Sequence, residues 1–230
     1  MKFGLLSTLL VLVMTLPWPH YIINAVLIFN LLLVFAWLVA SMFCRDVRFI
    51  KYFPGVLLFL HLLVLALNVS AMRLILQGHG FSIKIVEYIG NSIAGAQPGL
   101  GLVIFSLLSL IQFTLHNRAC TRIKCIADNL NIKHESIASS DLWLNFWKEM
   151  RGWAPFAKKL AWAHIIISFI NLVGGIVIGT YINGMELSLA CQYYAAATVG
   201  IGYVIAIQAL FLETSTGVVV SAYQKQIGNT

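Results

Sequence analysis

The residues with the clearest chemical potential lie near the middle of the chain, where His116 is followed by Cys120 and Cys125. An imidazole and two thiolates are ligands that zinc accepts in proteins. The gap of four residues between the cysteines differs from the usual two-residue gap, and the sequence offers no evident fourth ligand. We therefore expect reduced thiols that face the cytosol, and no bound metal.

Three further ionisable residues, His61, Arg73 and Glu213, lie in or beside long apolar runs. An ionisable side chain within a membrane is costly and is a functional candidate by default. His61 could relay protons, although the sequence shows no carboxylate in register with it. Glu213 could substitute for an acid lost elsewhere, or it could be a helix-end carboxylate near the cytoplasmic surface. The sequence favours the second interpretation of Glu213.

Signs of enzyme chemistry are absent from the sequence. It shows no Ser/His/Asp set, no phosphate-binding loop and no carboxylate pair, so we expect neither catalysis nor a cofactor. Asn68 and Ser70 match an acceptor motif for glycosylation, but they lie inside an apolar span, where that motif cannot be used.

Composition indicates the class of protein that must position these residues. Hydrophobic residues make up 60% of the 230 residues and charged residues 10%, with a mean hydropathy of +0.89. Soluble domains average about 25% charged residues. The apolar residues form blocks near the roughly 20 residues that a membrane-spanning helix needs. The run from Phe59 to Gly78 carries Asn68 deep inside it, and lipid offers an amide no partner, so this helix should face other protein.

Hydropathy predicts an all-α, polytopic bundle of about six transmembrane helices. The expected spans are Leu5 to Leu16, Tyr21 to Phe43, Phe53 to Leu76, Leu100 to Leu115, Ala161 to Tyr181 and Ala190 to Leu212. The first is interpreted as an uncleaved helix, because no small-residue cleavage site follows it.

The distribution of basic residues predicts the orientation. With the N-terminus inside, only Arg73 and Lys84 of the 15 Lys and Arg residues fall on the outer side. Cytoplasmic loops carry an excess of such residues, so both termini should be cytoplasmic. This bias accounts for the net charge of +7 without any need for nucleic-acid binding, because basic segments beside a membrane contact anionic lipid.

Three regions follow from these boundaries. Residues 1–116 should hold helices one to four, with an interfacial or re-entrant helix near 79–97 on the outer side. Residues 117–160 should form a short basic cytoplasmic loop, whose aromatic residues anchor a helix lying on the membrane. Residues 161–230 should hold helices five and six and a short tail. The aromatic residues of the loop are Trp143, Phe146, Trp147, Trp153 and Phe156.

Small and amide side chains indicate close packing between the helices. Glycines four residues apart let a neighbouring helix approach, and buried amides bond across helices. The predicted packing residues are Asn68, Asn171, Gly174, Gly175, Gly179, Gly95 and Gly99.

Several segments match, in order, the motifs of a known family. They are Leu16 to Pro19, Leu65 to Val69, Arg73 to Leu76, Lys84 to Glu87 and Phe169 to Gly179. The corresponding family patterns are LPxP for the first segment, ALNVASTRLIL for the second and third together, KVIE for the fourth and FINIIGGLIIG for the fifth. An ordered set is far more specific than any single motif. The chain resembles the N-terminal membrane half of the FHIPEP family, the large export-gate component of flagellar and virulence type III secretion systems.

The departures from the family pattern concern acidic residues above all. Asn24, Arg151 and Ile201 stand where the family has Asp, and nothing between Ile132 and Asp141 matches its acidic cytosolic stretch. The family's cytosolic domain, which docks export substrates, has no counterpart in the sequence. Because acids inside a bundle usually serve a function, the resemblance implies a truncated and degenerate homologue.

The resemblance implies a multi-pass protein of the bacterial inner membrane that takes part in type III or flagellar protein export. Its expected partners are other inner-membrane export subunits, membrane lipid and further copies of itself, and not nucleic acid. Two alternatives stay open: a small stand-alone transporter or proton channel, and a remnant without function. No inverted internal repeat, which would favour a transporter, is found in the sequence.

Overall fold

The computed structural model describes residues 16–43, 47–79, 83–94, 97–133 and 141–228. These residues are almost entirely helical and contain no strand. The helices are α2 (His20–Phe43), α3 (Val47–Leu74), α4 (Lys84–Ala94), α5 (Pro98–Lys133), α6 (Asp141–Phe169), α7 (Gly175–Val177) and α8 (Leu187–Gly228). Three short π-helical turns accompany these helices. The turn η1 (Ile75–His79) extends α3. The turn η3 (Ile170–Gly174) joins α6 to α7, and η4 (Ile178–Ile182) joins α7 to the loop before α8.

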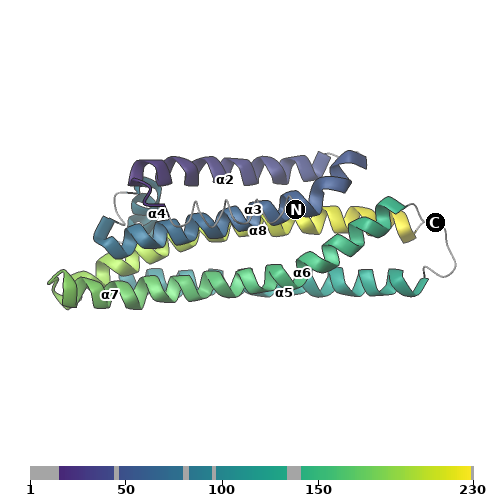
Figure 1. The fold of residues 1–230 in the computed structure, drawn as a ribbon. Helices are drawn as coiled ribbons and strands as arrows, with labels where there is room; N and C mark the ends of the chain where they lie inside the picture. Colours follow the sequence, from purple (N-terminus) through teal and green to yellow (C-terminus); the bar gives the residue numbers. More distant parts are fainter. Residues whose placement is uncertain (1–15, 44–46, 80–82, 95–96, 134–140, 229–230) are drawn as a thin grey trace.

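The long helices lie side by side and reverse direction in turn, as Figure 1 shows. Five helical segments of the described part are long and apolar enough to cross a membrane: residues 20–43, 48–78, 99–128, 145–182 and 187–222. The all-α, polytopic bundle predicted from the sequence is therefore confirmed. The expected first span, Leu5 to Leu16, lies outside the described residues except for Leu16 itself.

The middle of the chain differs from the sequence expectation. Residues 117–133 continue α5, and residues 141–160 belong to α6, so most of the segment expected to be a loop is helical. Trp147 and Trp153 are buried, and Phe146 packs against Phe53 of α3 with ring centroids 6.4 Å apart. The expectation that these three rings anchor a helix on the membrane surface is wrong, because they fill the space between α6 and α3.

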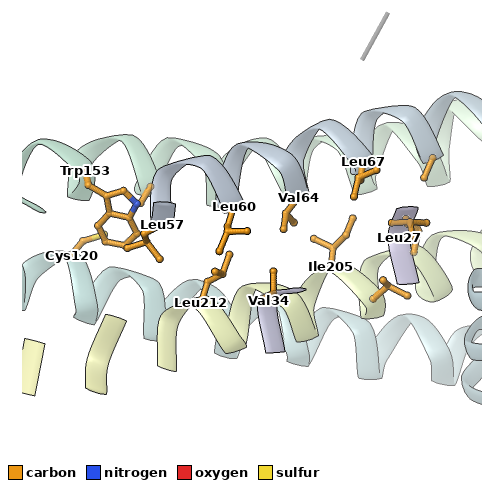
Figure 2. Packing of buried hydrophobic residues seen from close by; sticks show 14 of the residues in the cluster. Leu27, Val34, Leu57, Leu60, Val64, Leu67, Cys120, Trp153, Ile205 and Leu212 are labelled. Carbon is orange, nitrogen blue, oxygen red and sulfur yellow. The ribbon is translucent and has the colours of Figure 1, made fainter. Parts of the chain in front are cut away.

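The helix α8 forms the centre of the bundle and is the most buried of the five spans. It packs against α2, α3, α4 and α5. Figure 2 shows its Ile205 and Leu212 facing Val34 of α2 and Leu60 and Val64 of α3. Lipid is as apolar as these side chains, so close packing rather than expulsion from water must stabilise such contacts.

The short helix α4 lies directly against α8, as two glycines permit. A Cβ atom at Gly90 would collide with the carbonyl of Ala196, and one at Gly200 would collide with the carbonyl of Val86. The first turn of α4 is also tied to α2, because the Ile85 N–H donates to Asn24 Oδ1 over 3.1 Å. An amide acceptor at a helix start satisfies a backbone donor that has no partner within the helix.

Candidate functional site

Three ionisable side chains from three different helices meet inside the bundle: His61 of α3, His116 of α5 and Glu213 of α8. Their exposed fractions are 5%, 5% and 7%. Glu213 Oε1 contacts His116 Nδ1 and lies 3.8 Å from His61 Nε2. One carboxylate oxygen therefore faces two imidazole nitrogens, and we call these three residues the His–Glu cluster.

Hydrogen bonding sets the orientation of His61. Its Nδ1 lies 2.8 Å from the carbonyl of Leu57, one turn earlier in α3. A carbonyl only accepts, so Nδ1 must carry a hydrogen and donate it. The remaining nitrogen, Nε2, then faces Glu213 as a bare lone pair if His61 is neutral, and as a donor if His61 is protonated.

The protonation of the His–Glu cluster decides how its members interact. A neutral His116 with its hydrogen on Nδ1 donates that hydrogen to Glu213, whereas the Nε2 lone pair of a neutral His61 faces the same carboxylate. A further proton on His61 turns this lone pair into a donor and forms an ion pair with Glu213. The arrangement is suited to binding a proton within the bundle and to exchanging it between neighbouring groups.

Large and apolar side chains separate the His–Glu cluster from its surroundings. The indole of Trp153 lies 5.4 Å from the His61 ring and 6.1 Å from the His116 ring, centroid to centroid. Cys120, one turn after His116, is buried and donates its thiol hydrogen to the Ala154 carbonyl at 3.2 Å. Figure 2 shows Trp153 and Cys120 together near Leu57. Because these groups keep water away, charge interactions inside the cluster are much stronger than at a surface.

The structure changes the interpretation of two predicted residues. His61 has the carboxylate partner that the sequence did not reveal, and that partner is Glu213. Glu213 is not a helix-end carboxylate, because it is buried and α8 continues to Gly228. Sequence reasoning missed His116 as its partner and considered it only as a metal ligand. The missed signal was an acid within an apolar helix, which has to find a partner.

The pair of cysteines does not form one site with His116. Cys120 is buried whereas Cys125 is exposed. Among the described residues, no group of three His, Cys, Asp or Glu side chains is arranged to hold a metal ion.

Arg73 lies apart from the His–Glu cluster. It is half-buried in the last turn of α3 and lines a cavity of about 30 Å³ together with Trp18, Ser70 and Gln77. At about 1.5 Å per residue, Arg73 is roughly 18 Å from His61 along the helix. The two residues therefore do not act in one site.

Gly175 and Gly179, two of the predicted packing glycines, make room for an aromatic ring. A Cβ atom at Gly175 would overlap the ring of Tyr194, and one at Gly179 would come within 2.6 Å of it. Gly174 is less crowded, since the nearest atoms, from Ile170 and Leu76, would lie 3.7 and 3.9 Å from its Cβ.

The other predicted packing residues differ from one another. No heavy atom would lie within 4 Å of a Cβ at Gly99, and Gly95 lies outside the described residues. Asn171 is fully buried, and neither its side-chain oxygen nor its nitrogen has a hydrogen-bond partner. Asn68 is buried and lines a small cavity between α3, α5, α6 and α8.

The fold and the site together define a multi-pass helical membrane protein with a buried ionisable cluster. Comparison with known proteins makes this more specific, because the model of the FHIPEP family matches residues 10–128 and 140–230. The chain belongs to the FHIPEP family and is a multi-pass protein of the inner membrane.

Curated relatives agree with this assignment. The chain is 33% identical to the flagellar biosynthesis protein FlhA of Bacillus subtilis over 239 residues, which is 93% of this chain and 35% of that protein. It is 31% identical to the FlhA proteins of Salmonella typhimurium and Escherichia coli over 245 residues, or 94% of this chain. The chain thus spans about one third of the length of these relatives. No solved structure matches it.

Proposed function

We propose that the chain is a membrane-embedded component of a bacterial flagellar or type III protein-export apparatus, with a non-catalytic role. The observation that carries this proposal is the family match across nearly all of the chain, together with relatives named for flagellar biosynthesis. Its partners would be other inner-membrane subunits of the same apparatus. The packed interior supports a working protein, because α8 and its neighbours are closely fitted around a buried ionisable site.

Within this role, we assign the His–Glu cluster as a proton-dependent link between three helices. Glu213 on α8 is held by His116 on α5 and faces His61 on α3. Adding a proton to His61 replaces a lone pair that faces the Glu213 carboxylate by a hydrogen-bond donor, in a region of low dielectric constant. The packing of α8 against α3 and α5 would respond to that proton, because a ligand shifts a conformational equilibrium when it binds one state better.

Glu213 is proposed here as a substitute for acidic residues that the family has elsewhere. Asn24, Arg151 and Ile201 cannot act as proton-binding carboxylates. Asn24 instead accepts a hydrogen bond from the start of α4, and Arg151 pairs with Asp128 at 3.0 Å near the surface. Among the residues that the structure describes, Glu213 is the one buried carboxylate.

The second candidate function is a small proton channel or transporter that works alone. The same His–Glu cluster favours it, because two histidines and a carboxylate within a membrane are typical of proton relays.

Copurification and reconstitution distinguish the two candidates. The tagged chain would be solubilised from its own host in mild detergent, and export-apparatus membrane subunits would be identified by mass spectrometry. We expect those subunits to copurify with the wild type and with Glu186→Gln, a matched control at an exposed carboxylate. Purified chain that carries protons in liposomes, loses that flux in Glu213→Gln and brings down no export subunit would instead establish the stand-alone channel.

A further inference from the structure

A small cavity that contains several polar groups lies between four helices, and none of the three residues of the His–Glu cluster lines it. It offers about 30 Å³ to a water-sized molecule. Its lining includes Asn68 of α3, Ser109 and Gln112 of α5, and His164 and Ser168 of α6. Gly202 and Ile205 of α8 form part of the remaining wall. Apolar side chains of α5 and α6, among them Phe105, Phe113 and Ile165, line it as well, so the cavity is mainly apolar with polar groups from three helices.

His164 requires a partner in this cavity. Both of its ring nitrogens are inaccessible to solvent, and neither has a hydrogen-bond partner within the protein. A buried polar group without a partner costs free energy comparable to a lost hydrogen bond, so such groups nearly always bind protein or an ordered water. In a neutral imidazole one nitrogen donates and the other accepts, so two partners are needed.

The cavity has the size and the chemistry that a buried water requires. A water needs about 10–15 Å³ of such space and two to four polar partners. The amides of Asn68 and Gln112 supply both donors and acceptors, and His164 supplies a donor or an acceptor at either nitrogen. Ser168 already donates its hydroxyl hydrogen to the His164 carbonyl at 3.0 Å, which leaves its oxygen lone pairs to accept.

We propose that this cavity is a water-binding site, in which an ordered water hydrogen-bonds His164 and bridges it to Asn68 and Gln112. The water gives the amide of Asn68 a partner inside the membrane and joins α3, α5 and α6 through one molecule. The site lies about two helical turns from the His–Glu cluster, since Asn68 follows His61 on the same face of α3. The proposal does not depend on the function proposed above.

Solid-state NMR on the protein in lipid bilayers tests the site. Magnetisation transferred from water would be measured at the side-chain amide of Asn68 and at the ring nitrogens of His164. The internal control is Asn30, an equally buried amide whose Nδ2 donates to Gln208 Oε1 at 3.1 Å and which does not line the cavity. We expect transfer to Asn68 and His164 that clearly exceeds transfer to Asn30. Transfer to Asn68 and His164 no greater than to Asn30 would show a dry cavity and overturn the proposal.

Two histidine variants test whether His164 holds the water. His164→Phe should lower the transfer at Asn68 to the level of Asn30, because the ring can no longer bind the water. His20→Phe makes the same chemical change at an exposed position at the start of α2 and should leave that transfer unchanged. If His164→Phe fails to fold, the wild-type comparison of Asn68 with Asn30 still decides. Unchanged transfer at Asn68 in folded His164→Phe would remove His164 from the site and contradict the proposal.

Discussion

Replacing Glu213 by Gln is expected to destabilise the bundle strongly, because the change removes the charge that faces His61 and His116 while keeping the shape. Removing one partner of a buried ion pair typically costs about 3–5 kcal/mol, and a hydrogen bond to a charged group contributes about 1.5–3 kcal/mol. The glutamine can retain one hydrogen bond to an imidazole. We therefore expect a loss of about 3 kcal/mol in the free energy of unfolding.

The assay is denaturant unfolding of the purified protein in detergent, followed by circular dichroism. Glu186→Gln is the matched control, since Glu186 is exposed and its side chain accepts a hydrogen bond from Ser188 Oγ at 3.2 Å. A change at such an exposed site should stay within about 0.5 kcal/mol. Equal stability of the two variants would refute the reasoning that the His–Glu cluster is a buried, coupled unit.

A triple variant extends this test. Replacing His61, His116 and Glu213 together by apolar residues of similar size should recover most of the stability lost in Glu213→Gln. The reason is that removing all buried polar partners leaves no unpaired charge, and such replacements are often neutral or stabilising. A triple variant less stable than Glu213→Gln would show that packing around Trp153, rather than charge, dominates this region.

The remaining predictions concern packing, hydrogen bonding and orientation. Gly175→Ala should cost about 1–3 kcal/mol of unfolding free energy in the same assay, because the added methyl overlaps the Tyr194 ring. Gly99→Ala, where no atom lies nearby, should not destabilise the protein, and equal effects of the two variants would contradict the packing. Asn30→Leu should cost about 1–3 kcal/mol of unfolding free energy, since it leaves the buried Gln208 oxygen without its donor. The double variant with Gln208→Leu should regain part of this loss, and strictly additive losses in the two single variants would argue against the bond. A membrane-impermeant maleimide should label Cys125 in inverted inner-membrane vesicles but not in intact cells, and it should label Tyr88→Cys in intact cells but not in inverted vesicles; the reverse pattern would refute the charge-based orientation.

The helices were predictable from the sequence because hydropathy reports them directly, but their ends were less so. The basic residues after Leu115 suggested that α5 stops there. Yet the buried residues His116, Cys120, Ile123 and Ala127 recur at helical spacing, and this pattern continues the helix beyond the apolar block. A hydropathy profile averages over all faces of a helix, so it does not detect a helical segment whose outer face is charged.

The His–Glu cluster was predictable in part only. His61 and Glu213 could be singled out, because ionisable residues stand out in apolar runs. Their contact could not, because it depends on the register of α8 against α3, and that register is set by packing contacts such as Ile205 and Leu212 with Val64 and Leu60. The role of Trp153 was missed for a similar reason, because tryptophan serves equally well at a membrane surface and in an interior.

The central position of α8 has a consequence for biogenesis. During synthesis the ribosome delivers this segment last among the described helices, after α2 to α6 have already entered the bilayer. Until it arrives, α2, α4 and α5 lack their shared neighbour, and His61 and His116 lack the carboxylate of Glu213. The final tertiary arrangement can therefore form only after translation has reached the end of α8. A nascent chain halted earlier would remain a group of inserted but unpacked helices and would be a substrate for quality-control proteases.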